Sequence, residues 1–124
     1  DDMMRKAVNG ALMSVLADGL GALVAQTQHR LDAALRQAQD TAQVATEVKT
    51  EIARGAGARF LSVGRHACQR QNTDALEAVQ SALGVVIEYS TEKQWRDAAN
   101  ILNGVATQLE DYALYCFGGG NGKD

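Results

Sequence analysis

The 124-residue chain has no proline, two cysteines and few aromatic side chains, which make up 5% of the sequence. Proline interrupts helices and is favoured in turns, so its absence favours long, uninterrupted helices. Two cysteines are too few for a small fold held together mainly by disulfides. No apolar run approaches the roughly 18 residues that a membrane span needs. The formal net charge of −3 gives no general attraction to nucleic acid or to an anionic membrane.

The sequence also lacks the short motifs of catalysis and cofactor binding. It contains no Cys-x-x-Cys, no His-x-x-x-His and no Gly-x-Ser-x-Gly. His66 and Cys68 are two residues apart, which places them on different faces of a helix and argues against a shared metal site. Gly55-Ala56-Gly57 lacks the preceding strand and the Lys-Ser/Thr end of a phosphate-binding loop. We therefore expect no metal, haem or other cofactor and no enzymatic activity.

What the chain does contain is a succession of apolar stripes at helical spacing. These stripes predict helices over residues 3–17, 23–54, 58–70, 74–89 and 91–117. The clearest stripe lies in the last of them, where seven residues follow at steps of three or four: Trp95, Ala98, Leu102, Val105, Leu109, Tyr112 and Cys116. The Gly55-Ala56-Gly57 segment is the clearest predicted break. The sequence leaves open whether the first two helices are continuous across Gly19 and Gly21.

The predicted fold class is all-α, a four- to five-helix bundle of amphipathic helices. Residues 1–117 are expected to form a single helical bundle domain, and residues 118–124 a flexible glycine-rich tail. Gln71-Asn72-Thr73 is predicted to turn the chain and cap the helix that follows. Thr91 and Gln94 fit a capping box at the start of the last helix.

The two cysteines, Cys68 and Cys116, both lie on apolar stripes, which favours one disulfide between them. Such a bridge closes a loop of about 50 residues and contributes on the order of 4 kcal/mol in the chain-entropy model. The alternative is a cytosolic helical domain with two unpaired buried thiols.

Candidate binding residues gather in residues 52–73, which hold four arginines and no Asp or Glu. Arginine binds carboxylates through two parallel hydrogen bonds, so this segment predicts a basic patch that docks an acidic partner. The ordinary alternative is a solvated helix face. The candidate partner-binding residues are Arg54, Arg59, Arg65, His66 and Arg70.

Other residues admit further interpretations. An enzymatic alternative would need Arg36, Arg54, Arg59 and Arg96 around one cavity for a dicarboxylate substrate, and no spacing places them there. Phe117, beside Cys116, is expected to pack. Tyr115, on the other side of Cys116, either packs around a disulfide or is exposed as an interface anchor.

The chain begins with the acidic pair Asp1-Asp2 and the amphipathic run RKAVNGALMSVLADG, continues with a long Ala- and Gln-rich helix, and ends in DYALYCFGGGNGKD. Over nearly its whole length it resembles the small helical salivary proteins of anopheline mosquitoes, the group that includes albicin and anophensin. The resemblance implies a protein that is secreted in saliva and inhibits host defence in the blood meal without being an enzyme. It carries no family binding residue onto this chain.

The two branches of that group imply different targets. The albicin-like branch implies inhibition of the alternative complement pathway, by binding the assembled convertase, with properdin where present, and holding it in an unproductive state. The anophensin-like branch implies inhibition of contact-phase factors of the kallikrein–kinin system. A helical carrier of a small ligand is a further alternative. Nucleic acid and membranes are not expected partners.

Overall fold

The chain folds into an all-α bundle, as the stripes predict. The computed structural model describes the backbone of residues 2–118 and the side chains of residues 19–39 and 41–118. Its elements are α1 (Asp2–Gln37), a short 3-10 turn η1 (Ala38–Asp40), α2 (Ala42–Gln69), α3 (Thr73–Glu92) and α4 (Arg96–Phe117). The predicted tail beyond Gly118 lies outside the described residues, as do the side chains of the first predicted stripe.

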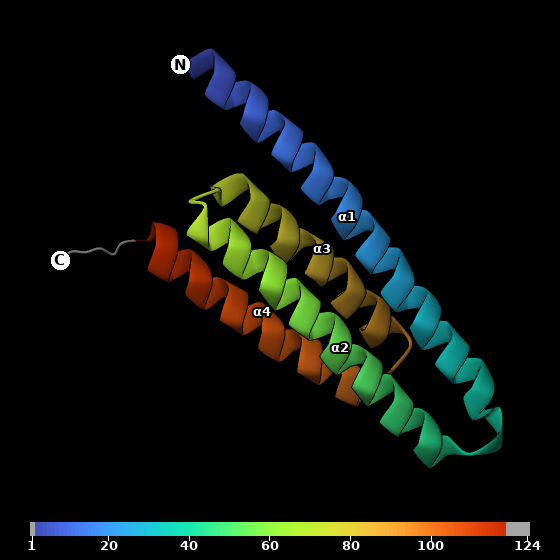
Figure 1. The fold of residues 1–124 in the computed structure, drawn as a ribbon. Coiled ribbons are helices and arrows are strands. Elements are labelled where there is room, and N and C mark those ends of the chain that lie inside the picture. Colours follow the sequence, from blue (N-terminus) through green and yellow to red (C-terminus); the bar gives the residue numbers. More distant parts are fainter. Residues whose placement is uncertain (1, 119–124) are drawn as a thin grey trace.

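The four helices run alternately up and down the bundle, so consecutive helices are antiparallel and α2 and α4 are parallel (Figure 1). Helix α2 packs most extensively against α4 and also contacts α1 and α3. Helices α1 and α4 lie on opposite sides of the α2–α3 pair, and the N-terminal part of α1 projects past the turn that joins α2 to α3 (Figure 1). The outer surfaces of α1 and α4 are therefore far apart.

The predicted helix break at Gly55-Ala56-Gly57 is wrong, because α2 runs through it without interruption. The chain turns earlier instead, at η1 and Thr41, whose backbone is extended with φ −152° and ψ 105°. Helix α1 is likewise continuous across Gly19 and Gly21. Residues 2–118, which the structure describes, thus form four α-helices where the stripes suggested up to five.

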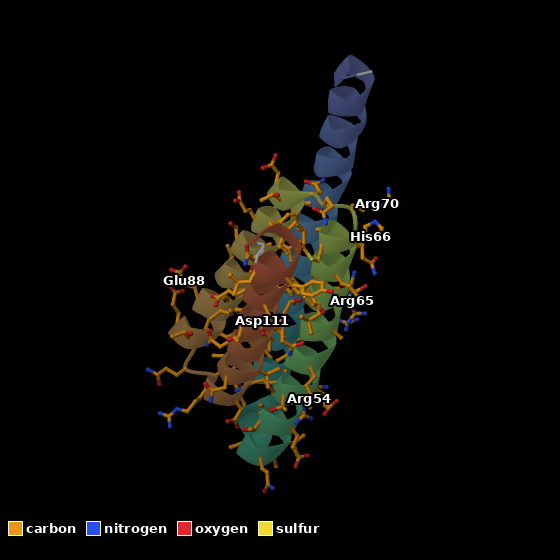
Figure 2. The ribbon with its side chains drawn as sticks, turned by 90° about the vertical axis from the view of Figure 1, so that its left-hand side faces the viewer. Arg54, Arg65, His66, Arg70, Glu88 and Asp111 are labelled. Atoms are coloured by element: carbon orange, nitrogen blue, oxygen red, sulfur yellow. A yellow bond between two sulfur atoms is a disulfide. The ribbon has the colours of Figure 1, made fainter. Side chains whose placement is uncertain are left out.

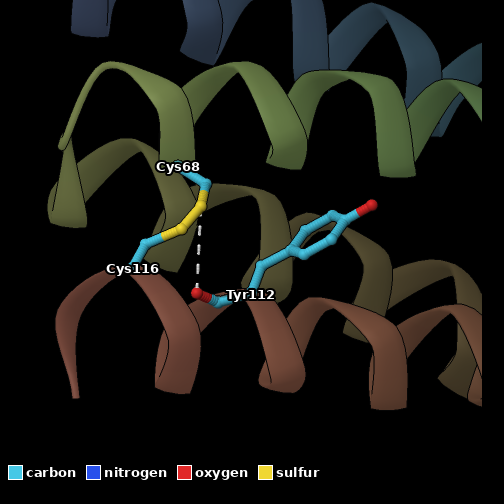
Figure 3. Close-up of a disulfide and its surroundings, with 3 residues drawn as sticks. All are labelled: Cys68, Tyr112 and Cys116. Atoms are coloured by element: carbon cyan, nitrogen blue, oxygen red, sulfur yellow. Dashed lines mark hydrogen bonds between the residues drawn. A yellow bond between two sulfur atoms is a disulfide. The ribbon is translucent and has the colours of Figure 1, made fainter. Parts of the chain in front are cut away.

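The glycines of α2 serve its contact with α4. A Cβ at Gly57 would lie 2.7 Å from Cγ2 of Val105, and a Cβ at Gly64 would overlap Cδ2 of Leu109. Small residues therefore let the two helix backbones approach closely. Near the end of this contact Cys68 and Cys116 form the predicted disulfide, with their Cα atoms 5.7 Å apart (Figure 3). The Sγ of Cys68 also lies 3.9 Å from the carbonyl oxygen of Tyr112.

The core is formed by the stripes that face inward. The first five residues of the predicted α4 stripe are buried, from Trp95 to Leu109, and they pack with buried residues of the other three helices. The predicted turn and cap before α3 are confirmed, since the Asn72 side chain accepts a hydrogen bond from the Ala75 amide at 3.0 Å. The predicted Thr91–Gln94 capping box is wrong. Helix α3 continues to Glu92, and Gln94 adopts a left-handed φ of 61° in the turn to α4.

Candidate functional site

The five predicted partner-binding residues all lie on the outer surface of α2, between its middle and its C-cap. Arg54, Arg59, Arg65, His66 and Arg70 are exposed, and Figure 2 shows four of them along one edge of the bundle. Arg54 forms an ion pair with Glu51 at 2.7 Å. Because those two side chains are 62% and 72% exposed, this pair adds little to stability and leaves the surface accessible.

The structure divides these residues into two stripes. Residues eleven positions apart return to nearly the same side of a helix, so Arg59 and Arg70 share one stripe and Arg54 and Arg65 another. The first stripe faces α1, since Nη1 of Arg59 donates a hydrogen bond to Oε1 of Gln26 at 2.8 Å. The second lies toward α4, since Arg65 is one turn before Cys68, which is bonded to α4.

The stripe that faces α1 borders a small groove of about 120 Å³ between the two helices. Arg30 of α1 and Arg59 of α2 both line it, together with the side chains of Gln26 and Thr27. Two guanidinium groups at one groove suit a carboxylate of a partner, because each can donate paired hydrogen bonds to it. Sequence reasoning missed Arg30, because nothing in the pattern of α1 shows which of its polar residues lies beside α2.

Charge is segregated across the bundle. Residues 52–72 hold four arginines and no carboxylate, whereas residues 73–117 hold seven Asp and Glu against two Lys and Arg. Figure 2 shows Glu88 of α3 at the opposite edge of the bundle from Arg70 and His66, with Asp111 of α4 between them. The surface formed by Arg30, Arg59, His66 and Arg70, called here the α1–α2 basic surface, therefore presents a concentrated positive potential within a chain of negative net charge.

A second depression, of about 660 Å³, lies at the turn between α3 and α4. Polar side chains surround it, among them Gln94, Arg96 and Asn100. Trp95 also lines it and is 6% exposed. Nζ of Lys49 lies 5.0 Å from the centre of the Trp95 ring. Burial lowers the pKa of Lys49. The arginines of the enzymatic alternative do not meet here, since Arg96 lines this depression and Arg59 lines the α1–α2 groove.

The two aromatic residues beside the disulfide, in the last turn of α4, differ in their exposure to solvent. Phe117 packs against the core, as predicted. Tyr115 points into solvent and is 89% exposed, and its neighbour Leu114 is 67% exposed. Of the two alternatives for Tyr115, the structure shows the exposed side chain.

Among the residues that the structure describes, no three His, Cys, Asp or Glu side chains come together as a metal ion would require. Over the same part of the chain, no helix combines the length and the apolar character of a membrane span. No family model, no curated protein and no solved structure matches the chain.

Proposed function

We propose that the protein is a secreted salivary inhibitor that acts by binding a host protein complex, without catalysis. The observation that carries the proposal is the α1–α2 basic surface, in which Arg30 and Arg59 line one groove and residues 52–72 of the chain contain no carboxylate. Complementary charge steers a partner toward such a surface and fixes its orientation. An acidic protein surface is therefore the proposed ligand.

The proposed target is the assembled convertase of the alternative complement pathway, with properdin where present, as the resemblance to the anopheline salivary proteins implies. An inhibitor of this kind needs a rigid surface that prefers one conformation of its target, because preferential binding shifts the target's population toward that conformation. The close α2–α4 contact and the Cys68–Cys116 bridge supply such rigidity behind α2. Contact-phase factors are the alternative target.

Secretion is part of the same proposal. Disulfides persist in oxidising compartments and are rare in the cytosol of most organisms. The Cys68–Cys116 bridge supports a protein that works outside the cell.

The test is lysis of rabbit erythrocytes in human serum through the alternative pathway, with increasing amounts of the protein. We expect dose-dependent inhibition with the classical pathway spared. The double variant Arg59→Glu/Arg70→Glu should inhibit at least about tenfold more weakly, because it reverses two charges of the surface that meets the acidic partner.

A matched control is Lys93→Glu/Arg96→Glu, which changes the net charge equally at the exposed turn between α3 and α4. This control should inhibit like the unmodified protein. Equal inhibition by both double variants would refute the surface assignment. Absence of inhibition by the unmodified protein at micromolar concentration, together with inhibition of contact-phase activation, would move the proposal to the alternative target.

A further inference from the structure

The exposed end of α4 has the composition of an interface. Asp111, Leu114 and Tyr115 are spaced at i, i+3 and i+4, so they share one face of the helix. The two apolar side chains are 67% and 89% exposed, and Asp111 beside them is exposed as well. Tyrosine is among the residues that most often carry binding energy in protein interfaces, where it is buried by a partner.

This part of α4 lies alongside a region of α2 with the opposite charge. Arg65 is exposed on the α4 side of α2, and half-buried Leu61 lies one turn before it. Helices α2 and α4 run parallel and are joined by the disulfide between Cys68 and Cys116. The heights of two residues along the bundle can therefore be compared by their distances from this disulfide along each helix axis. At about 1.5 Å per residue, Arg65 lies about 4.5 Å and Asp111 about 7.5 Å from the bridge along the helix axes. The two charges therefore lie at nearly the same height (Figure 2).

Neither charge is neutralised within the molecule. Among the residues that the structure describes, the one ion pair is that of Arg54 with Glu51, so Arg65 and Asp111 are both free to pair elsewhere. The α2–α4 face, defined by Leu61, Arg65, Asp111, Leu114 and Tyr115, thus combines apolar surface with one charge of each sign. A surface that carries both members of a charge pair is complementary to itself.

We infer that the α2–α4 face binds a second copy of this chain in a two-fold symmetric dimer. A two-fold axis that passes between Arg65 and Asp111 places each residue opposite its counterpart's partner, Arg65 of one copy beside Asp111 of the other. Tyr115 lies one helical turn C-terminal to Asp111. Because the two-fold rotation reverses the direction along the helix axes, Tyr115 of one copy faces the part of α2 in the second copy that lies one turn N-terminal to Arg65. That is the level of Leu61, whose apolar surface suits the tyrosine ring.

This inference goes beyond the proposed function, because dimerisation is measured on the protein alone, with no complement component present. It also leaves the α1–α2 basic surface open, since Arg59 and His66 lie on the other side of α2. A dimer would then present two basic surfaces to a target and bind it with the avidity of a bivalent ligand.

The experiment is sedimentation equilibrium of the full chain with its disulfide intact, up to about 1 mM protein, where even a weak dimer is populated. Asp111→Arg and Arg65→Glu should each raise the dimer dissociation constant at least about tenfold, because each places like charges opposite one another. Tyr115→Ser should raise it similarly by removing the apolar anchor. The matched control Glu88→Arg, on α3 and away from the face in Figure 2, should leave it unchanged.

The decisive variant carries both exchanges, Asp111→Arg with Arg65→Glu, which restores opposite charges across the two-fold axis. Its dissociation constant should return to within about threefold of the original value, because the coupling of two contacting charges appears in such a double exchange. A protein that stays monomeric at about 1 mM would overturn the inference. The inference would also be overturned if the double variant dimerised as weakly as either single variant while all variants kept the melting temperature of the unmodified protein.

Discussion

Replacement of Gly57 by alanine tests whether α2 needs a glycine where it meets α4. A Cβ at this position would lie 2.7 Å from Cγ2 of Val105, whereas carbon atoms in ordinary contact are about 3.5–4.0 Å apart. Valine is branched at Cβ and is stiff in a helix, so its methyl group does not rotate away at low cost. Overpacking of this kind costs about 1–3 kcal/mol.

Gly55→Ala is the matched control, in the same helix and two residues away. A Cβ at Gly55 meets no atom within 4 Å. Both variants gain about 1 kcal/mol from the better helix propensity of alanine. The free energies of unfolding of the two variants should therefore differ by about 1–3 kcal/mol, with Gly55→Ala the more stable.

Urea unfolding monitored by circular dichroism measures this difference directly. In thermal melts it corresponds to roughly 4 °C for each kcal/mol in a domain of this size. The second substitution Val105→Ala should relieve the clash, so the cost of Gly57→Ala should be smaller in that background than in the unmodified protein. If Gly57→Ala is as stable as Gly55→Ala, the close approach of α2 and α4 does not explain the glycine, and the reasoning is refuted.

Three further perturbations have expected outcomes. Replacing Cys68 and Cys116 together by serine should lower the free energy of unfolding, measured by urea titration, by about 4 kcal/mol in the chain-entropy model. An unchanged free energy of unfolding would show that the bridge does not constrain the unfolded chain. Asn72→Ala should cost about 1 kcal/mol in the same assay, because the Ala75 amide loses its side-chain acceptor, and an unchanged midpoint would contradict that capping contribution. Burial, with the hydrogen bond from the Tyr89 hydroxyl to Asp32, raises the pKa of Tyr89 from 10.0 to about 12. The contribution of the protonated Tyr89 hydroxyl to the free energy of unfolding is therefore complete below pH 10 and is lost as the pH rises through 12. The stability difference between the protein and Tyr89→Phe should therefore shrink between pH 9 and pH 12, and a difference that stays constant would argue against this assignment.

The position of a helix and its buried face were predictable from the sequence where the spacing of apolar residues alone determines them. The stripe of α4 has buried residues from Trp95 to Leu109 at helical spacing, and no other structure buries residues at that spacing on one side. Asn72 was predictable as a cap because its side chain competes locally for backbone hydrogen bonds. In both cases the determining interactions lie within a few residues of one another in the sequence.

The helix ends were less predictable because contacts between helices decide them. Gly55-Ala56-Gly57 has the local signature of a break, but Gly57 is required in the interior of α2 by Val105 of α4, which is distant in the sequence. The true turn, at η1 and Thr41, contains neither glycine nor proline and gave no comparable signal. The basic character of residues 52–72 was visible in the sequence, whereas the participation of Arg30 depends on how α1 docks against α2.

The disulfide joins α2 to α4 and encloses α3 in its loop, which leaves α1 outside the covalently closed part of the chain. Helix α1 is held by its buried leucines and by two described side-chain hydrogen bonds, Gln26 with Arg59 and Asp32 with Tyr89. It is therefore the helix that can open as a separate cooperative unit while the other three stay connected. Because the groove between Arg30 and Arg59 exists only when α1 is docked, a partner that occupies the groove also stabilises α1 against opening. Amide hydrogen exchange in α1 would then slow on binding, whereas exchange in α4 would change little.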